Sequence, residues 1–333
     1  MQSSPAREPV KRAAVVCNPS KVDVRALHDI VAAEEERCGY LPTLWFETSV
    51  DDPGQAVARK ALQAAPSVVI VVGGDGTVRA VAETVHSSDV PLAIVPVGTG
   101  NLLARNLRLT LADLPLSVHV AFGGTDRAID IAFAELERED GSISGHAFLV
   151  MAGIGLDANM AANTNSALKK RIGWLAYAHP IAASVIRNKQ LPMHYKLDDG
   201  RARSVRAHTV IVGNCGTLTA KILLLPDALV DDGLLDVVVL RPKGAFGWAR
   251  IGSRLALNGV LQRSRGGRRL MQAAPNIRAL QYVQARQLIV RFNTPEPIEL
   301  DGDSFGAASA AKLSVLHRGL TVRVPLPAIS ARR

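Results

Sequence analysis

Strand-like segments alternate with helical segments over residues 11–125, and this pattern constrains the fold more than any other feature. The apolar runs are AAVVC (13–17), TLWFE (43–47), SVVIVV (67–72) and PLAIVPV (91–97). Helical spacing follows each run, over 22–37, over 54–64, over about Thr77–His86 and in a segment that opens near Gly100. Continuous apolar strands that alternate with helices are typical of a parallel sheet covered on both faces. We therefore predict an α/β domain.

The pattern changes after residue 125, where strand-like runs such as RARSVRAHTVIVGN (201–214), RQLIVRFN (286–293) and PIELDGD (297–303) are followed by turn signals. Two helical stretches interrupt these runs, at about 166–188 and 244–262. This arrangement predicts a mostly antiparallel β-sandwich or barrel as the second domain. The expected domains are a disordered tail (1–10), an α/β domain (11–125), a β-rich domain (126–325) and a short tail (326–333), with the last strand free to return to the first domain.

The amino-acid composition limits which binding partners and which cellular compartment we expect for this protein. The 333 residues suit two domains, and the apolar content of 48% is ample for packed cores. Aromatic residues make up only 4%, which disfavours base stacking on nucleic acid, while the net charge of +9 favours an anionic partner. Three scattered cysteines and no signal peptide predict a reducing, cytoplasmic setting. The longest apolar stretch (172–186) is short and contains His179 and Pro180, so we expect no transmembrane helix.

Two glycine-bearing turns follow predicted strands, GGDGT at 73–77 and PVGTGNLLARN at 96–106. Ligands of open parallel sheets lie at the carboxyl ends of the strands, where helix N-termini attract phosphate. Glycine lets backbone approach such a ligand, and Asp75 could hold Mg²⁺, a metal-bound water or a hydroxyl group. A purely structural turn is the alternative. Neither turn is a GxxxxGK[ST] phosphate loop, and no GxGxxG follows the first strand.

The ordered motifs GGDGTV, PVGTGNLLARNL, GIGLDA (153–158), LLPDALVDDGLLDVVVL (224–240) and ELDGD (299–303) resemble the diacylglycerol kinase catalytic-domain family. That family contains soluble bacterial lipid kinases and is related to the sphingosine and ceramide kinases. The resemblance runs from about Ala13 to Val324. It implies a Rossmann-like nucleotide domain of the NAD kinase and diacylglycerol kinase type, a β-sandwich domain, and an ATP-dependent kinase acting on a lipid hydroxyl.

The resemblance also implies where the cosubstrate binds. ATP lies between the two domains in the family, and threonine hydroxyls at strand ends can donate to phosphate oxygens. Capping or turn formation is the alternative role for Thr48. The matching positions are Asn18, Thr48, Gly73, Gly74, Asp75, Gly76, Thr77, Val78, Arg79 and Thr99.

Three aspartates match catalytic positions of the family. Asp303 matches the proton acceptor of bacterial members, Asp130 matches an aspartate linked to the active-site Mg²⁺ through water, and Asp75 matches an essential carboxylate. Asp75 is the base itself in the sphingosine kinase branch. Both Asp75 and Asp303 therefore remain candidate bases, and each aspartate could alternatively be a turn residue or a cap.

The segment LPDALVDDGLLD resembles the structural magnesium site of the family. Its predicted ligands are the Asp232 side chain and the backbone carbonyls of Leu229 and Leu234, and an Asp-Gly hairpin turn is the alternative. The chain departs from the family at two places. Leu102 stands where many members carry aspartate, and the segment 216–220 replaces a glycine-rich turn.

The expected substrate is a lipid at a membrane surface. A basic cluster with Trp174 and Tyr177 suits an interfacial contact, and four arginines suit anionic phospholipid. These arginines are Arg263, Arg265, Arg268 and Arg269. A solvated basic loop is the alternative. We expect peripheral membrane association and no nucleic-acid partner, and a homodimer remains open.

Two other functions are open at this point, an NAD kinase, which also carries GGDGT, and a non-catalytic lipid or nucleotide sensor. The GTGNLLAR turn and the DDGLLD segment favour the lipid kinases over the NAD kinases. A serine hydrolase reading of GDSFG (302–306) fails because no aspartate or glutamate follows Asp303. The identity of the acceptor lipid, acyl-glycerol or sphingoid, is left open.

Overall fold

The computed structural model describes residues 11–111, 113–155, 190–216, 225, 228–241 and 280–326. These residues form two compact units. The first unit contains residues 11–98, 107–128 and 320–326, and the second contains Thr99–Asn106 and the described part of Ile129–Gly319. Two long strands, β5 (Thr125–Glu137) and β14 (Asp303–Val324), contribute residues to both units.

The first unit is built on a parallel sheet with the strand order β14-β4-β3-β1-β2. All four neighbouring pairs are parallel. The strands are β1 (Lys11–Cys17), β2 (Tyr40–Glu47), β3 (Val68–Gly73), β4 (Leu92–Pro96) and the end of β14, where Val322 and Arg323 pair with Leu92 and Ala93. Every residue of β3 and β4 is buried, because helices cover both faces of the sheet.

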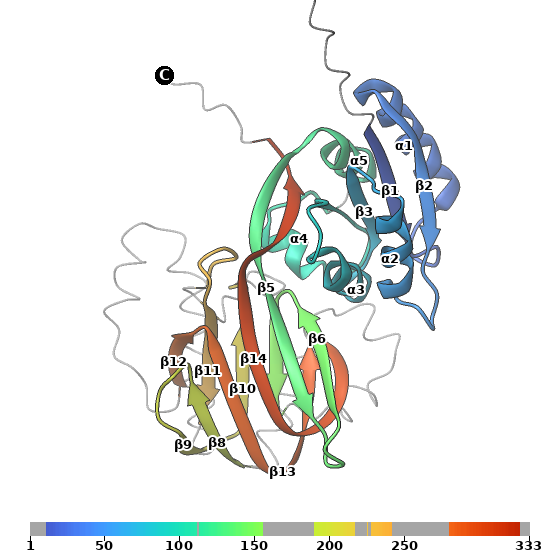
Figure 1. Ribbon diagram of the computed structural model, residues 1–333. Helices are drawn as coiled ribbons and strands as arrows, with labels where there is room; N and C mark the ends of the chain where they lie inside the picture. The colour runs from blue at the N-terminus through green and yellow to red at the C-terminus, as the bar shows by residue number, and fades with distance from the viewer. Residues whose placement is uncertain are drawn as a thin grey trace, which may run out of the picture. The chain divides into compact units, whose positions relative to one another are not determined.

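The helices of this unit are α1 (Val24–Cys38), α2 (Gln55–Gln63), α3 (Asp75–Val85) and α5 (Leu114–Gly123). On one face, alternate residues of β1, β3 and β4 pack with α1 and α5 in one core cluster. Successive side chains of a strand point to opposite faces, so the remaining buried strand residues face the other side, where α2 and α3 pack together. This is the α/β arrangement that the alternating pattern predicted (Figure 1).

The second unit is β-rich and antiparallel. Its antiparallel pairs are β10–β11, β10–β7, β11–β12, β13–β14, β13–β7, β13–β8, β5–β6 and β8–β9. The main path is β12-β11-β10-β7-β13-β14, with β5 and β6 attached at β14, and β8 and β9 attached at β13 (Figure 1). Its remaining strands are β6 (Ile143–Phe148), β7 (Met151–Ile154), β8 (Leu191–Leu197), β9 (Arg203–Ala207), β10 (Thr209–Gly213), β11 (Leu235–Leu240), β12 (Leu280–Ala285) and β13 (Gln287–Leu300). The short helix α4 (Leu102–Asn106) also belongs to this unit.

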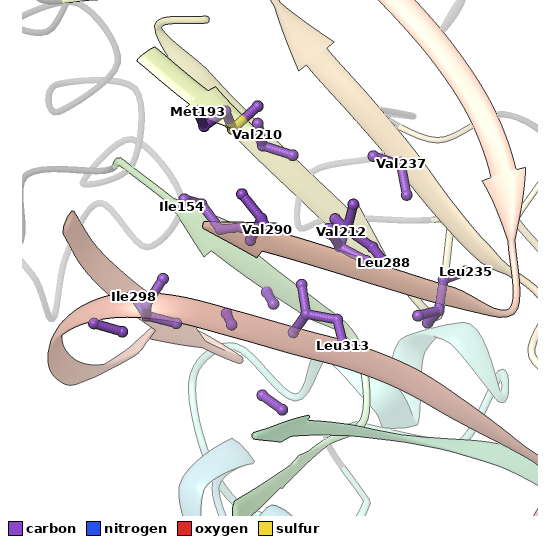
Figure 2. Close-up of a cluster of buried hydrophobic side chains, with 14 of the residues drawn as sticks. Ile154, Met193, Val210, Val212, Leu235, Val237, Leu288, Val290, Ile298 and Leu313 are labelled. Atoms are coloured by element: carbon purple, nitrogen blue, oxygen red, sulfur yellow. The ribbon is translucent and has the colours of Figure 1, made fainter. Parts of the chain in front are cut away.

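The core of the second unit consists of inward-facing aliphatic residues from most of its strands (Figure 2). Ile154 on β7, Val212 on β10 and Leu288 on β13 are almost completely buried in it. Such burial contributes about 1.5–3 kcal/mol for each large aliphatic side chain. The packed strands form a stable framework for the turns at their ends.

The strands of this unit differ from the sequence prediction at several places, and the run RARSVRAHTVIVGN forms two strands, β9 and β10. Strands β8 and β12 were not predicted, and the runs RQLIVRFN and PIELDGD form one strand, β13, instead of two. The register of β13 against β14 shifts between Arg291 and Glu296 and again near Pro297, so bulges keep the strand continuous around a residue that cannot donate to the ladder. The helical stretches predicted at 166–188 and 244–262 lie outside the described residues.

None of the helices in the described ranges is long and apolar enough to cross a membrane.

Candidate active site

The carboxyl ends of the first three strands bring together predicted nucleotide-binding residues. Asn18 directly follows β1, and its backbone N–H donates to the carbonyl of Val72 on β3 at 2.9 Å. Thr48 follows β2, and its N–H donates to the carbonyl of Cys17 at 2.9 Å. These bonds place Asn18, Thr48 and Gly73 at one edge of the parallel sheet, where ligands of such sheets bind.

The Asn18 side chain is engaged locally. Its Oδ1 accepts hydrogen bonds from the backbone N–H and the hydroxyl of Ser20, at 3.1 and 2.7 Å. The carboxamide therefore shapes the turn after β1, and only its Nδ2 group could donate to a phosphate oxygen. Thr48 is 7% exposed, so little of this residue is accessible to solvent.

The GGDGT turn leads directly from β3 into α3. Gly74 is the N-cap, and the first helical residue is Asp75, two residues earlier than the sequence predicted. The first turn of a helix leaves backbone N–H groups without intrahelical acceptors, and the helix dipole makes this end positive. Asp75 is half-buried beside these groups. An anionic phosphate group and a metal-binding carboxylate are both favoured at such a position.

The structure gives Gly73 a reason to be glycine that involves no ligand. A Cβ at this position would lie 2.6 Å from the Cβ of Thr77, so a side chain would collide with the first turn of α3. A Cβ on Gly74 would meet only the Cα of Gly98, at an ordinary 3.6 Å. Gly73 is therefore required by close packing of strand and helix, whereas the space at Gly74 tolerates a small residue. Of the remaining predicted residues, Thr77, Val78 and Arg79 are buried in α3, and Gly76 is half-buried.

The second glycine turn is divided between the units. Gly98 belongs to the first unit, while Thr99 is exposed and belongs to the second together with α4. The Arg105 guanidinium closes the turn by donating from Nε to the carbonyl of Gly100 at 2.7 Å. Leu102 is 8% exposed, so an apolar side chain packs where many family members have a carboxylate.

Asp130 on β5 is completely buried and accepts hydrogen bonds from three donors. Its Oδ2 accepts from the N–H of Gly233 at 2.6 Å. Its Oδ1 accepts from His317 Nδ1 at 2.9 Å and from the N–H of Arg318 at 2.7 Å. Asp130 therefore ties the 230–234 loop to β14. The water-linked contact with Mg²⁺ that the family resemblance implied stays a prediction, since protein donors already occupy both oxygens.

The segment around Asp232 has the chemistry of a hard-cation site. Asp232 Oδ1 accepts from the N–H of Leu234 at 3.0 Å, which is an Asp-based turn, and Leu229 is exposed nearby in the sequence. Burial, followed by the negative charges of Asp130 and Asp231, raises the pKa of Asp232 above its usual value. A bound cation would relieve this repulsion between carboxylates, and Mg²⁺ takes oxygen ligands of this kind. The Asp232 carboxylate and the carbonyls of Leu229 and Leu234 therefore suit Mg²⁺ by their chemistry, and their placement around one ion stays a prediction.

This fit gives a stability prediction. At a Mg²⁺ concentration about 100 times its Kd, binding to the folded state should stabilise the wild type by about 2.7 kcal/mol. Asp232→Ala should lose most of that gain in a thermal melt with and without Mg²⁺. Asp140→Ala is the matched control, because Asp140 Oδ1 accepts in the same way from the N–H two residues later, that of Ser142. Equal stabilisation of the wild type and Asp232→Ala by Mg²⁺ would contradict the site.

Asp303 is exposed and is the first residue of β14. It pairs with Leu300 across a hairpin whose two loop residues are Asp301 and Gly302. Asp75 lies in the first unit, whereas Asp130, Asp232 and Asp303 lie in the second. Sequence reasoning missed Asp301, which accepts three backbone hydrogen bonds. The Asp-Gly pair between apolar strands was a signal that could have pointed to it.

Comparisons with known proteins agree with this architecture. Residues 12–134 match the diacylglycerol kinase catalytic domain, and residues 149–323 match the YegS C-terminal NAD kinase beta sandwich-like domain. A "Probable lipid kinase YegS-like" of Pseudomonas fluorescens is 33% identical over 193 residues, which cover 56% of this chain and only 59% of that protein. The diacylglycerol kinase of Bacillus subtilis is 24% identical over 95% of this chain and 97% of its own length.

Solved structures show the same fold. A crystal structure of a diacylglycerol kinase from Bacillus anthracis superposes with a TM-score of 0.70 at 20% identity, over 96% of this chain and 98% of the other. The C-terminal family model alone covers more than half of the chain, and the N-terminal model covers the segment that contains the GGDGT turn. The chain therefore belongs to the diacylglycerol kinase catalytic-domain family, with a YegS-type C-terminal β-sandwich domain.

Proposed function

We propose that this protein is an ATP-dependent lipid kinase that transfers the γ-phosphoryl group to a lipid hydroxyl, with diacylglycerol as the acceptor and phosphatidic acid as the product. The observation that carries the proposal is the junction of β3 and α3. There a helix N-terminus begins with a carboxylate, Asp75, at the sheet edge that also bears Asn18 and Thr48. This combination suits a nucleotide phosphate chain with a bound divalent cation.

Each group has a definite task in the proposed reaction. The N–H groups at the start of α3 bind phosphate oxygens, and Asp75 fixes the cation-phosphate assembly. Mg²⁺, when bound with ATP, supplies positive charge that neutralises the phosphoryl group in transfer. The acceptor hydroxyl oxygen forms a bond to the γ-phosphorus as the bond to the β-phosphate oxygen breaks and ADP leaves. Asp303 accepts the hydroxyl proton late in this step, and Asp75 is the alternative base.

A panel of acceptors tests the proposal. Purified protein is incubated with γ-labelled ATP and Mg²⁺ in detergent micelles that contain diacylglycerol, ceramide or sphingosine, and separately with NAD. Labelled phosphatidic acid is the expected product. If only sphingoid lipid is labelled, the acceptor is sphingosine or ceramide and not diacylglycerol. Labelled NADP would mean that the protein is an NAD kinase. Absence of transfer would overturn the kinase proposal.

Access to a lipid requires contact with a membrane surface, which we assign to the arginines at 263, 265, 268 and 269, outside the described residues. Each basic residue near an anionic surface contributes about 1 kcal/mol at physiological ionic strength. Replacing all four by glutamine should therefore weaken binding to vesicles with phosphatidylserine by at least about 100-fold. Added salt should weaken wild-type binding in a sedimentation assay. Salt-insensitive binding, or an unaffected variant, would count against this surface.

A further inference from the structure

The carboxylate of Asp301 is a buried clamp between the β13–β14 hairpin and the turn that joins β6 to β7. Asp301 Oδ2 accepts from the N–H of Leu149 at 2.8 Å. Its Oδ1 accepts from the N–H of Val150 at 2.8 Å and of Met151 at 3.0 Å. The backbone N–H of Asp301 donates to the carbonyl of Met151 at 2.9 Å. Four hydrogen bonds therefore link Asp301 to the three consecutive residues Leu149–Met151, and Asp301 is only 7% exposed.

The hairpin that holds Asp301 has a left-handed backbone at both loop positions. Asp301 and Gly302 form its two-residue loop, with φ of 50° and 88°. Positive φ at both loop positions is what a type I′ turn requires, and aspartate followed by glycine is a favoured pair there. Aspartate is one of the few non-glycine residues enriched in the left-handed region. The three N–H donors hold its side chain in place, and Asp303 follows immediately after the loop.

The other side of the clamp is itself fixed. The carbonyl of Val150 accepts from the N–H of Asn214 at 2.8 Å. The Asn214 carboxamide is buried, and its Nδ2 donates to the carbonyls of Leu149 at 3.0 Å and Asp130 at 3.1 Å. A continuous set of hydrogen bonds therefore runs from the Asp303 hairpin to Asp130, whose carboxylate binds the N–H of Gly233 in the proposed cation loop.

We propose that Asp301 is a positioning residue of the kinase site, whose carboxylate locks the hairpin so that Asp303 has one orientation toward the acceptor hydroxyl. This inference rests on the proposed function. Proton transfer requires the base within about 3 Å of the hydroxyl oxygen, and a displacement of about 1 Å can cost on the order of 100-fold in rate. Asp301 acts through the backbone and takes no part in the chemistry.

Asp301→Asn tests the clamp with almost no change in side-chain volume. An amide has one acceptor oxygen, and its NH₂ group would face a backbone N–H donor, so at least one of the three bonds is lost. We expect kcat to fall about 10–100-fold while KM for ATP stays within about twofold, because the base moves and the nucleotide residues of the first unit do not. Hydrogen exchange at Leu149, Val150 and Met151 should become faster.

Two controls separate positioning from general destabilisation. Asp198 also has a left-handed backbone, with φ of 46°, and its Oδ1 accepts from the N–H groups of Arg286 and Gln287 at 2.9 Å each. That turn carries no proposed site residue, so Asp198→Asn should keep wild-type kcat. Val290→Ala removes packing in the core, where Val290 is 1% exposed. This variant should have a lower melting temperature, and its kcat should equal the wild-type value at temperatures below that melting temperature.

Gly302→Ala disturbs the same hairpin without touching the buried carboxylate, because alanine disfavours a φ of 88°. If Asp301→Asn does not fold, Gly302→Ala tests the positioning role in its place. We expect Gly302→Ala to lower kcat and to leave KM for ATP unchanged. Wild-type kcat in either folded hairpin variant would overturn the positioning role, as would a kcat of Val290→Ala as low as that of Asp301→Asn. Wild-type protein that transfers no phosphoryl group to any lipid would overturn the proposed function instead, and the positioning role with it.

Discussion

Replacing Asp75 by asparagine is expected to lower phosphoryl transfer by about 10⁴-fold or more, at or beyond the upper limit for loss of a single acid-base group. The reason is that Asp75 is the first residue of α3, so its negative charge lies next to the backbone N–H groups at the start of the helix. The substitution removes the charge that would hold the cation, and electrostatic positioning is the main source of catalysis in phosphoryl transfer.

The fold should survive this change. A carboxylate in the first turn of a helix stabilises it by only about 0.3–1 kcal/mol when it is accessible to solvent. Asp113→Asn is the matched control, because Asp113 is the N-cap of α5 in the same unit and accepts from the N–H of Leu116 at 2.9 Å. Kinetics and melting curves of both variants check the prediction. Near-normal turnover by Asp75→Asn would mean that GGDGT is only a structural turn.

Replacing Asp303 by asparagine should lower kcat by about 10²–10⁴-fold, the usual cost of removing a general base. Asp303 is exposed at the start of β14, where an acceptor hydroxyl can reach it, and it lies in a different unit from the residues of the GGDGT turn. The Kd for ATP should therefore remain within about twofold of the wild-type value, as transfer to the hydroxyl is impaired and nucleotide binding is not.

Titration calorimetry with ATP and steady-state kinetics measure the two quantities separately. Ser304→Ala is the local control, because it changes the next residue, which is also exposed, and leaves the carboxylate in place. Full activity of Asp303→Asn together with an inactive Asp75→Asn would assign the base to Asp75. A weakened Kd for ATP in Asp303→Asn would contradict the separation of base and nucleotide residues.

Much of the fold was predictable from sequence because burial on both faces leaves continuous apolar runs. The strands around 13–17 and 67–72 are examples, and every residue of β3 is buried. Strand β8 was missed because its exposed positions carry Pro192 and His194, and its later core-facing residues, Tyr195 and Leu197, are only partly buried. Strand β13 was divided in two because the break near Pro297 is a bulge within one strand.

The candidate site was predictable to the extent that motifs lie next to strands in the chain. The positions of Asn18, Thr48 and Gly73 at one sheet edge follow from the parallel order. The hydrogen bonds of Asp130 and Asp301 do not follow from any local pattern. Asp130 binds a residue 103 positions away and Asp301 one 152 positions away, so only the folded chain shows these contacts.

In the proposed reaction, the GGDGT turn holds ATP while its γ-phosphoryl group moves to a lipid hydroxyl. The most direct test compares the wild type with Asp75→Asn in mixed micelles of diacylglycerol, with γ-labelled ATP and Mg²⁺, and measures label in the lipid extract. We expect labelled phosphatidic acid from the wild type, with labelling that depends on Mg²⁺ and is linear in protein concentration, and none above background from Asp75→Asn. Equal labelling of lipid by both proteins, or no labelled lipid from the wild type, would contradict this proposal.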